Sequence, residues 1–467
     1  MQFRSHRIVL AGVLAAFALG AQAKVPEKEA AKLGNELTPL GAKRAGNADG
    51  TIPAWDGGIT AIPEAAKQAG YTSEKGARLV DPFPDDEPRF TITNDNLDQY
   101  RDKLTPGQIA LFERFEDYKM PVYQTRRTAA NDEYIYKATR ENATRAELVA
   151  DGEGLEGAAV GIPFPIPQNG REVIWNHKVR YRGVAVRRWN NQFPVTSDGD
   201  FNAVKLQEDV FFPYSAPGTT PEQVERSNVI IYFLQVVRAP ARLAGQILLV
   251  HDTANQVREP RRAWLYNPGQ RRVRRAPNVA YDNPGTASDG LRTNDQLDMF
   301  NGAMDRYTWK LEGKREIYVP YNAYRLHSGD LSYDDIFNEG HIDQDLTRYE
   351  LHRVWVVDSF VREGTSHIYK RRTYYVDEDS WQILAVDAYD QRDQLWRVQE
   401  AHPIVAYDPA FYITTLSAGE LVYDLQNERY LGMAFNNDSE EVYPIEDEIG
   451  DPARYFNPRN IQRFAFK

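Results

Sequence analysis

The chain has 467 residues, no cysteine and a formal net charge of −11 at pH 7. The lack of cysteine excludes disulfides, thiolate nucleophiles and Cys-ligated metals, so stability must come from burial of apolar surface. The acidic balance argues against general nucleic-acid binding, because contacts to phosphate dominate that affinity. Aromatic residues make up 12% of the chain, which supplies large side chains for a sizeable core.

The first 23 residues have the three parts of a secretory signal. Arg4 and Arg7 give a positive start, residues 8–20 are apolar, and Ala21-Gln22-Ala23 forms a small-residue cleavage site. An N-terminal membrane anchor is the alternative, but the apolar run is shorter than the ~20 residues that a bilayer core needs. We therefore expect cleavage after Ala23 and a soluble periplasmic protein, which without cysteine is not a lipoprotein.

Residues 24–100 are rich in Pro, Gly and charge and show no sustained periodicity, which predicts an extended N-terminal arm over a folded body. Trp55 stands among recurring turn residues and is the expected anchor of this arm. Thr105-Pro106-Gly107-Gln108 predicts a helix start with a capping box, and the helix should end before Pro121. Residues 220–223 repeat the same device before a strand, so the second helix must be short.

From about residue 171 to 398, segments rich in β-branched and aromatic residues alternate with turn signals. This pattern predicts one long antiparallel meander of about ten or eleven strands. The expected strands are 173–181, 184–189, 229–238, 245–251, 262–266, the region of Val273, 307–311, 316–319, 353–362, 366–376, 382–389 and 394–399. Hairpin turns are expected at 267–269, 362–364 and 377–380. The proline-interrupted stretch 401–467 should pack across the body as short elements.

Residues 33–58 closely resemble the N-terminal signature of a proteobacterial family of unknown function, domain-of-unknown-function family 1329. The resemblance returns in 161–167, in Ile174-Trp175-Asn176-His177 and from Arg262 to Tyr324. Members of the family are exported and resemble the lipoprotein carriers LolA and LolB in fold. The resemblance implies an α+β protein with a large curved antiparallel β-sheet, a half-barrel, covered by helices. We expect a signal peptide at 1–23, the arm at 24–100, and the sheet domain with helical and C-terminal additions at 101–467.

Catalytic signatures are weak. There is no G-x-S-x-G elbow or Walker loop, and no histidine belongs to an H-E-x-x-H pair. Gly152, Gly154 and Gly157 match G-x-G-x-x-G, but Glu153 and Glu156 would repel phosphate, so a flexible loop is expected. The acidic runs 377–379 and 446–448 lack the oxygen spacing of an EF-hand loop and are predicted to be solvated turns. We expect no catalytic residue, no metal, no cofactor and no enzymatic activity.

Ligand binding is the better prediction. Arginine pairs are frequent for an acidic chain, and they could form outer salt bridges or a rim that grips an anionic head group. An aromatic interior would then hold the tail, although each aromatic residue could equally be core. The pairs are 187–188, 261–262, 271–272, 274–275 and 371–372. The candidate ligand-binding residues are Trp175, His177, Arg262, Trp264, Tyr266, Arg272, Phe300, Met304, Tyr307 and Trp309.

The expected function is binding or transfer of a hydrophobic or amphipathic, lipid-like molecule between envelope membranes. The family resemblance implies work with an RND-type inner-membrane transporter and an outer-membrane protein. Two alternatives remain open: a structural adaptor that docks such partners without a ligand, and an enzyme without a recognisable motif. The length of the chain and its long arm depart from the small lipoprotein carriers, which argues against lipoprotein itself as the cargo.

Overall fold

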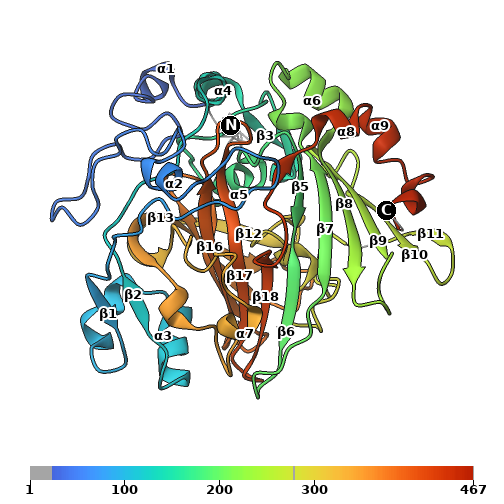
Figure 1. Ribbon diagram of the computed structural model, residues 1–467. Helices are drawn as coiled ribbons and strands as arrows, with labels where there is room; N and C mark the ends of the chain where they lie inside the picture. The colour runs from blue at the N-terminus through green and yellow to red at the C-terminus, as the bar shows by residue number, and fades with distance from the viewer. Residues whose placement is uncertain (1–23, 277–278, 466–467) are drawn as a thin grey trace, which may run out of the picture.

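The computed structural model describes residues 24–276 and 279–465. The predicted signal peptide and its cleavage site lie outside these residues. Within them, no helix combines the length and the apolar character needed to cross a membrane. Two large antiparallel sheets dominate the fold, with short helices and long irregular segments around them (Figure 1).

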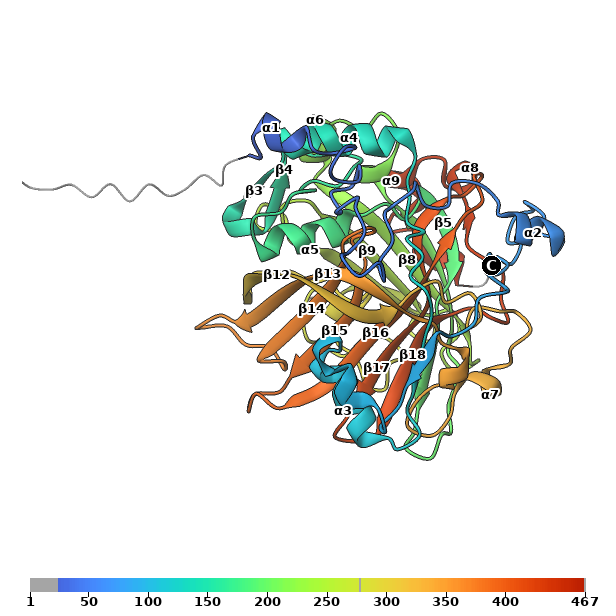
Figure 2. The ribbon, with the colours of Figure 1, turned by 90° about the vertical axis from the view of Figure 1, so that its left-hand side faces the viewer.

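The larger sheet has ten strands. In sheet order its strands are β1 (Phe90–Ile92), β2 (Met120–Val122), β13 (Tyr349–Val361), β14 (Arg371–Asp377), β15 (Ile383–Tyr389), β16 (Leu395–Ala406), β17 (Ile413–Asp424), β18 (Arg429–Phe435) and β6 (Asn191–Val195), and β12 (Tyr307–Pro320) also pairs with β13. Figure 2 shows that β12 to β18 follow one another in chain order. Short connections join each of these strands to the next, except that 28 residues separate β12 from β13.

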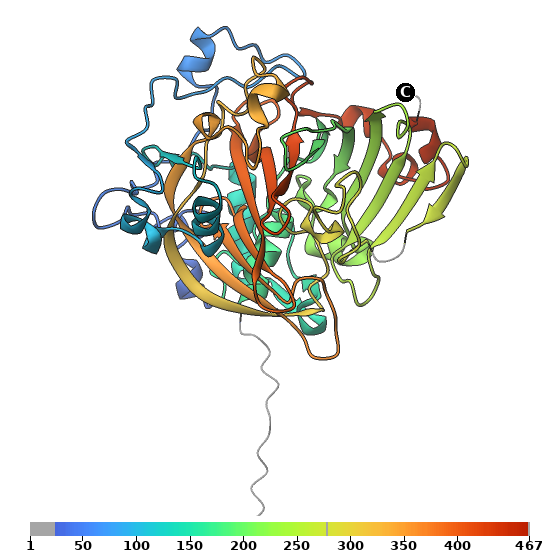
Figure 3. The same cartoon turned by 90° about the horizontal axis from the view of Figure 1, so that it is seen from below.

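The second sheet has seven strands. Their order is β11 (Arg272–Arg275), β10 (Arg262–Asn267), β9 (Ile247–Thr253), β8 (Val229–Ala239), β7 (Lys205–Phe211), β5 (Ala185–Trp189) and β19 (Tyr443–Pro444). Only Asn190 separates β5 in this sheet from β6 in the larger one. The chain therefore passes directly from one sheet into the other, and the two sheets form one bent unit (Figure 3). A small two-stranded sheet, β3 (Glu147–Val149) and β4 (Gly154–Glu156), lies apart.

Helices are short and lie at the faces and rims of the sheets. They are α1 (Glu27–Ala30), α2 (Glu64–Gln68), α3 (Pro106–Arg114), α4 (Glu133–Arg145), α5 (Gly170–Val179), α6 (Pro221–Ser227), α7 (Tyr333–Ile336), α8 (Glu446–Ile449) and α9 (Pro452–Tyr455). The 3-10 turns are η1 (Leu97–Gln99), η2 (Arg101–Lys103), η3 (Ala150–Gly152), η4 (Pro213–Ser215), η5 (Asn294–Gln296), η6 (Gln344–Leu346) and η7 (Ile461–Phe464).

Helices α3 and α5 cover opposite faces of the larger sheet. At the start of α3 the backbone N–H of Gly107 donates to Asp387 on β15 at 3.0 Å, and Tyr375 donates to the same carboxylate at 3.0 Å. Gly170 at the start of α5 lies against Val357, which is paired in register with Tyr374. Because Tyr374 and Tyr375 point to opposite faces of their strand, the two helices lie on opposite sides.

Several local predictions are confirmed. The fold is α+β with curved antiparallel sheets. Both capping boxes form, at Thr105 with Gln108 and at Thr220 with Gln223. The three predicted turns each join a pair of antiparallel neighbours: β10 and β11, β13 and β14, β14 and β15. The expected strands 307–311 and 316–319 are one strand, β12, whose register shifts between Leu311 and Gly313.

Three predictions of secondary structure are wrong. The single meander expected from about residue 171 to 398 is divided between two sheets, with β5 and β7 to β11 in one and β6 and β12 to β16 in the other. Residues 173–181 were expected as a strand, yet most of them belong to α5, whose N-cap Asn169 accepts a hydrogen bond from the N–H of Glu172. Nearly all of this helix is buried, so it lacks the amphipathic pattern by which a surface helix is recognised. The stretch 401–467 was expected to form short elements only, but it supplies the end of β16 and the long strands β17 and β18.

Candidate ligand-binding site

The space between the two sheets is filled by α5 and by the segment that joins β11 to β12. Five of the predicted ligand residues are buried there: Trp175, His177, Phe300, Met304 and Tyr307. The indole N–H of Trp175 donates to the carbonyl of Gly152 at 2.9 Å. Burial lowers the pKa of His177 to about 3, so the ring is neutral and carries one N–H. Its Nε2 donates to the carbonyl of Asp298 at 2.8 Å and its Nδ1 accepts from the N–H of Ile383 at 3.2 Å, so the ring links α5 to both segments.

The predicted aromatic block surrounds a buried arginine. Phe300 and Tyr307 pack around half-buried Trp309, with ring centroids 5.4 and 5.9 Å from it. The guanidinium of Arg372 lies 5.3 Å from the ring of Phe300 and 4.7 Å from that of Tyr307. Asp295 pairs with Arg372 at 2.9 Å and neutralises it. This block is an ordered part of the core, held by aromatic contacts and a buried ion pair.

Little room remains between the sheets. A cavity of about 60 Å³ lies there, against the apolar side chains of β8 and β9. Four arginines, Arg182, Arg188, Arg261 and Arg292, contribute to its lining. Arg182 pairs with Asp298, Arg188 with Glu208 at 2.7 Å, and Arg261 with Asp252 at 2.7 Å. Pockets for small molecules measure about 300–1,000 Å³, so this cavity does not accommodate a lipid.

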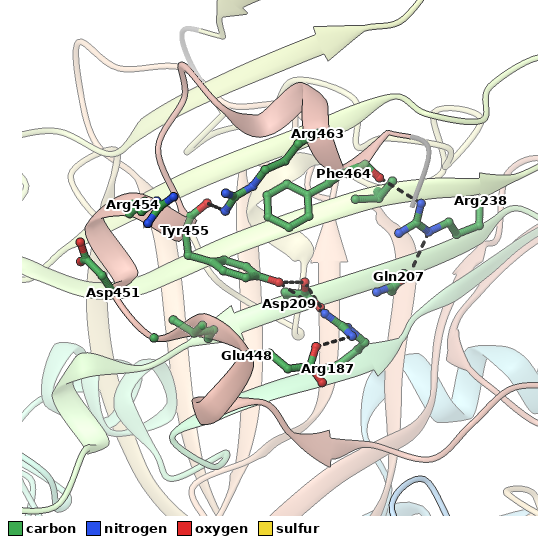
Figure 4. Close-up of a pocket in the computed structure, with 13 residues that line it drawn as sticks. Arg187, Gln207, Asp209, Arg238, Glu448, Asp451, Arg454, Tyr455, Arg463 and Phe464 are labelled. Atoms are coloured by element: carbon green, nitrogen blue, oxygen red, sulfur yellow. Dashed lines mark hydrogen bonds and ion pairs between the residues drawn. The ribbon is translucent and has the colours of Figure 1, made fainter.

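A larger cavity lies on the opposite face of the seven-stranded sheet. Its volume is about 700 Å³, and it lies between the sheet and the C-terminal segment that carries α8, α9 and η7 (Figure 4). Alternation along β8 separates the two cavities, because Val236 and Arg238 line the large one whereas Phe233 and Gln235 line the small one. The lining residues are Arg187, Gln207, Asp209, Val236, Arg238, Glu448, Ile449, Gly450, Asp451, Arg454, Tyr455, Arg463 and Phe464.

An apolar cluster fixes the C-terminal segment on this face. Phe456 stacks on Tyr232 of β8 with ring centroids 5.3 Å apart, and His251 of β9 hydrogen-bonds the carbonyl of Phe456 at 2.9 Å. Tyr455 and Phe464 pack against each other at 5.0 Å. Burial lowers the pKa of His251 to about 4, so the ring is neutral and donates to this carbonyl at neutral pH.

One arginine of the cavity is fully paired. Arg187 makes two bonds to Asp209, at 2.6 and 3.0 Å, and one to Glu448 at 2.9 Å. The hydroxyl of Tyr455 donates to Asp209 at 2.7 Å. Burial opposes the charge of Arg187, but its hydrogen bond to Asp209 raises its pKa above the ordinary value. These residues tie β5 and β7 to α8 and α9 and leave this part of the lining close to neutral.

Three other arginines have no carboxylate at ion-pair distance among the described residues: Arg238, Arg454 and Arg463. Arg238 donates to Gln207 at 2.9 Å and to the carbonyl of Phe464 at 3.1 Å, and burial lowers its pKa. Arg463 lies over the ring of Phe464 at 4.6 Å and donates to the carbonyl of Tyr455 at 3.3 Å. Guanidinium groups remain charged at neutral pH. Asp451, whose carboxylate caps α9, also lines the cavity, so the lining carries four arginines and three carboxylates, a small excess of positive charge beside aromatic surface.

The predicted residues of β10 lie on the same face of the sheet as the large cavity, but they do not line it. Arg262, Trp264 and Tyr266 share one face of β10, as alternation predicted, and Tyr266 belongs to the same apolar cluster as Phe464. Half-buried Trp264 contacts His251, and Arg262 pairs with Glu259 at 2.9 Å, but none of the three lines the cavity. Arg272 is exposed on β11, with its side chain on the other face. The aromatic composition of residues 401–467 was the one available signal for the cavity residues of α9 and η7.

One buried group has the composition of a metal site. His352, Asp377 and Asp379 bring potential ligand atoms within 4.8 Å of one another. Asp379 is held by Arg127 through two bonds, at 2.8 and 2.7 Å, and Asp377 accepts from Tyr321 at 3.0 Å. These donors already occupy most of the carboxylate oxygens, so the group is an ionic cluster of the core. The prediction that residues 377–379 form a solvated turn is wrong, because all three are buried.

Comparison with known protein families identifies the family of this chain. The model of the family described as "Protein of unknown function (DUF1329)" matches residues 91–462. The chain belongs to this family. An uncharacterized protein of Pseudomonas aeruginosa is 52% identical over 438 residues, which cover 92% of this chain and 93% of that protein. A DUF1329 family protein from Desulfovibrio piger, solved by crystallography, is 14% identical over 59% of this chain and 90% of its own, with a TM-score of 0.39. A LolA superfamily protein from Nitrosomonas europaea is 11% identical over 61% and 97%, with a TM-score of 0.34.

Proposed function

We propose that this protein is a periplasmic carrier that binds an amphipathic, anionic lipid-like molecule in the cavity beneath its C-terminal segment. One observation carries the proposal: a space of about 700 Å³ in which Arg238, Arg454 and Arg463 stand without carboxylate partners among the described residues. This volume lies within the range of small-molecule sites. An anionic ligand group would stabilise these arginines by forming charge-assisted hydrogen bonds with them.

The lining has a charged part, which suits an acidic head group, and an apolar part, which suits an aliphatic tail. Guanidinium groups bind carboxylate or phosphate in a fork that fixes its orientation. Val236, Ile449 and Phe464 supply apolar surface, on which each buried methylene of a tail gains ~0.8 kcal/mol before the entropic costs of association. A molecule with one acidic head and one aliphatic tail uses both parts, whereas a purely polar metabolite leaves the apolar part unused.

The cellular setting rests on the sequence. The predicted signal peptide places the protein in the periplasm, and the family resemblance supports work with an RND-type inner-membrane transporter and an outer-membrane protein. In this setting the protein moves its ligand between the two membranes without altering it. The second candidate, a structural adaptor without a ligand, is favoured by the dense packing between the two sheets, where the cavity measures only about 60 Å³.

Binding of a fluorescent fatty acid and of the matching fluorescent fatty alcohol tests the proposal. Replacing Arg238 and Arg463 together, Arg238→Gln/Arg463→Gln, should weaken the acid about tenfold or more, because hydrogen bonds to charged groups contribute ~1.5–3 kcal/mol each. The alcohol should change little. Arg101→Gln, at an exposed arginine paired with Asp98 and Glu113, is the control and should alter neither affinity.

The adaptor reading predicts a different result. If neither probe binds the wild-type protein at micromolar concentration, the carrier proposal fails. Equal weakening of acid and alcohol in the arginine variant would also contradict it, since the cavity would then hold no head-group site. Mass spectrometry of lipid extracted from protein purified from its own periplasm identifies the natural ligand where binding is found.

A further inference from the structure

The edge strand β11 carries an unusual concentration of unpaired charge. Arg271, Arg272, Arg274 and Arg275 are exposed, and none has a carboxylate at ion-pair distance among the described residues. The protein has 67 acidic residues, so partners are abundant elsewhere. The other arginine pairs noted in the sequence use them: Arg187 binds Asp209, Arg261 binds Asp252, and Arg372 binds Asp295. Salt bridges therefore form at those positions, although those of Arg261 and Arg372 are buried and do not lie on an outer face, and β11 has none among the described residues.

Apolar surface adjoins these arginines. Arg274 stands opposite Leu265 in register, and Leu265 stands opposite Leu248 on the next strand, so the three side chains form a row across one face. Leu265 is 45% exposed, and it is one of three large apolar side chains that are exposed among the described residues. Exposed leucine beside unpaired arginine is the composition of surfaces that rest on a membrane interface.

The hairpin of β10 and β11 lies at the outer end of the seven-stranded sheet, away from β5 and β19 (Figure 1, Figure 3). Its turn is close to the segment that covers the large cavity. A Cβ built on Gly245 would lie 3.2 Å from the carbonyl oxygen of Ala465 and 3.5 Å from Pro268 of the turn. Phe464, the neighbour of Ala465, lines the cavity. A surface that rests on the hairpin therefore meets the molecule next to the cavity.

Charged residues on an edge strand can also serve only to prevent pairing with another sheet. One or two charges suffice for that purpose, and either sign would do. Four arginines in five positions create a local positive field on a protein whose net charge is −11, and that field selects an anionic surface.

We propose that β11 and the turn before it, residues 267–275, dock the protein on the anionic surface of a phospholipid bilayer. The arginines contact lipid phosphates, and Leu265 enters the interface beside them. Lipid phosphates form a broad field of mobile anions that can reach arginines on both faces of an edge strand, whereas an acidic peptide strand would need its carboxylates in a matching register. This docking goes beyond the carrier function and does not require that the cavity holds a ligand.

Co-sedimentation of the mature protein with phosphatidylcholine vesicles, with and without phosphatidylglycerol, tests the proposal. We expect binding only to the anionic vesicles, and weaker binding as salt is raised. Each arginine near an anionic surface is worth about fivefold in partitioning, so Arg272→Gln/Arg274→Gln should weaken binding about 20- to 30-fold. Arg272→Lys/Arg274→Lys should retain most of it, because a membrane surface responds to charge and not to fork geometry.

The control variant is Arg101→Gln/Arg114→Gln, which removes the same charge at exposed arginines that pair with carboxylates elsewhere. It should bind anionic vesicles like the wild type. Circular dichroism and thermal melting confirm that each variant is folded. Equal losses in the two glutamine variants would overturn the proposal, as would equal binding to neutral vesicles. Binding to polyglutamate without binding to vesicles would overturn it in favour of an acidic protein partner.

Discussion

At the residue scale, the most consequential finding is the buried ionic cluster at the turn between β14 and β15. Glu378 binds Arg353 at 2.6 Å and Lys314 at 2.6 Å, and Asp379 binds Arg127. The sequence shows the acids as one run and the cations scattered, 25 to 252 positions away. Charge matching of this kind depends on tertiary contacts, so composition alone could only suggest a solvated turn. An unpaired member would cost several kcal/mol, which makes the cluster a strong constraint on the fold.

His352 offers a test of this cluster. Burial would lower its pKa, but hydrogen bonds with Asp377 and Glu350 raise it to about 9. Protonated His352 therefore stabilises the folded state below pH 6.5, where the unfolded chain is also protonated, and this contribution is lost as the pH rises through 9. We expect His352→Gln to be less stable than the wild type by about 2–3 kcal/mol at pH 6. The difference should shrink towards pH 10, as measured by urea denaturation.

The matched control for this prediction is His251→Gln. Burial holds the pKa of His251 at about 4, so this ring is neutral over the whole range from pH 6.5 to 10. Because only the unfolded chain titrates here, near pH 6.5, its variant should differ from the wild type by a free energy of unfolding that is nearly constant from about pH 7.5 to 10. A stability difference for His352→Gln that is likewise constant would show that the imidazole is neutral in the folded protein.

At the scale of elements, the strands, hairpins and capped helices that depend on neighbouring residues could be predicted from the sequence. Features that depend on contacts between distant residues could not. Capping boxes and turn residues act within four positions, so Thr105 and the turn at 267–269 could be read directly. Helix α5 is buried all round, and a stretch without a polar face is hard to distinguish from a strand. Prolines at 403 and 409 suggested interruption, yet Pro403 lies within β16, where the register to β17 shifts. Irregular pairing accommodates a residue that cannot donate to the ladder.

The N-terminal arm is attached by backbone contacts that the sequence could not indicate. Arg127 donates to the carbonyl oxygens of Lys43, Arg44 and Pro53, and Arg353 donates to those of Lys43 and Ala45. The same guanidinium groups bind Asp379 and Glu378. The turn-rich signature of residues 33–58 therefore passes over the buried ionic cluster, and its exposed carbonyl groups are satisfied there.

Trp55 adds a side-chain anchor to this attachment. Its indole N–H donates to the carbonyl of Ala129 at 3.0 Å, and Arg44 lies 5.3 Å from its ring. We expect Trp55→Ala to increase thermolysin cleavage within residues 24–89 while the sheets stay folded. The ring is half-buried, so the cost should be below the ~3–5 kcal/mol of a fully packed site. Lys67→Ala, an exposed change in the same arm, is the control, and equal cleavage of both variants would refute the anchor.

At the scale of the whole molecule, the position of the cavity depends on which sheet face residues 446–465 cover. The strands of the second sheet carry apolar side chains on both faces: Ile231 and Phe233 towards the inner cavity, Leu234 and Val236 towards the C-terminal segment. Sequence periodicity shows that both faces of this sheet are covered, but it does not show which segment of the chain covers each face. The bent connection of β5 to β6 then closes the inner face, and the large cavity lies on the outer one, against β5, β7 and β8. The turn before β11 lies close to Ala465, at the end of the segment that covers this cavity.

This arrangement predicts how the protein delivers its ligand. If the cavity opens next to a membrane-docking strand, transfer of a fluorescent fatty acid to anionic acceptor vesicles should occur during collision. The transfer rate should then rise with vesicle concentration and with phosphatidylglycerol content, and should fall as salt screens the arginines. In Arg272→Gln/Arg274→Gln the equilibrium affinity for the probe should persist, because neither residue lines the cavity. Its transfer should be slower and independent of vesicle concentration, limited by dissociation into water. A wild-type transfer rate that does not change with vesicle concentration would contradict delivery by collision. It would leave the proposed binding in the cavity intact, with release of the ligand into solvent.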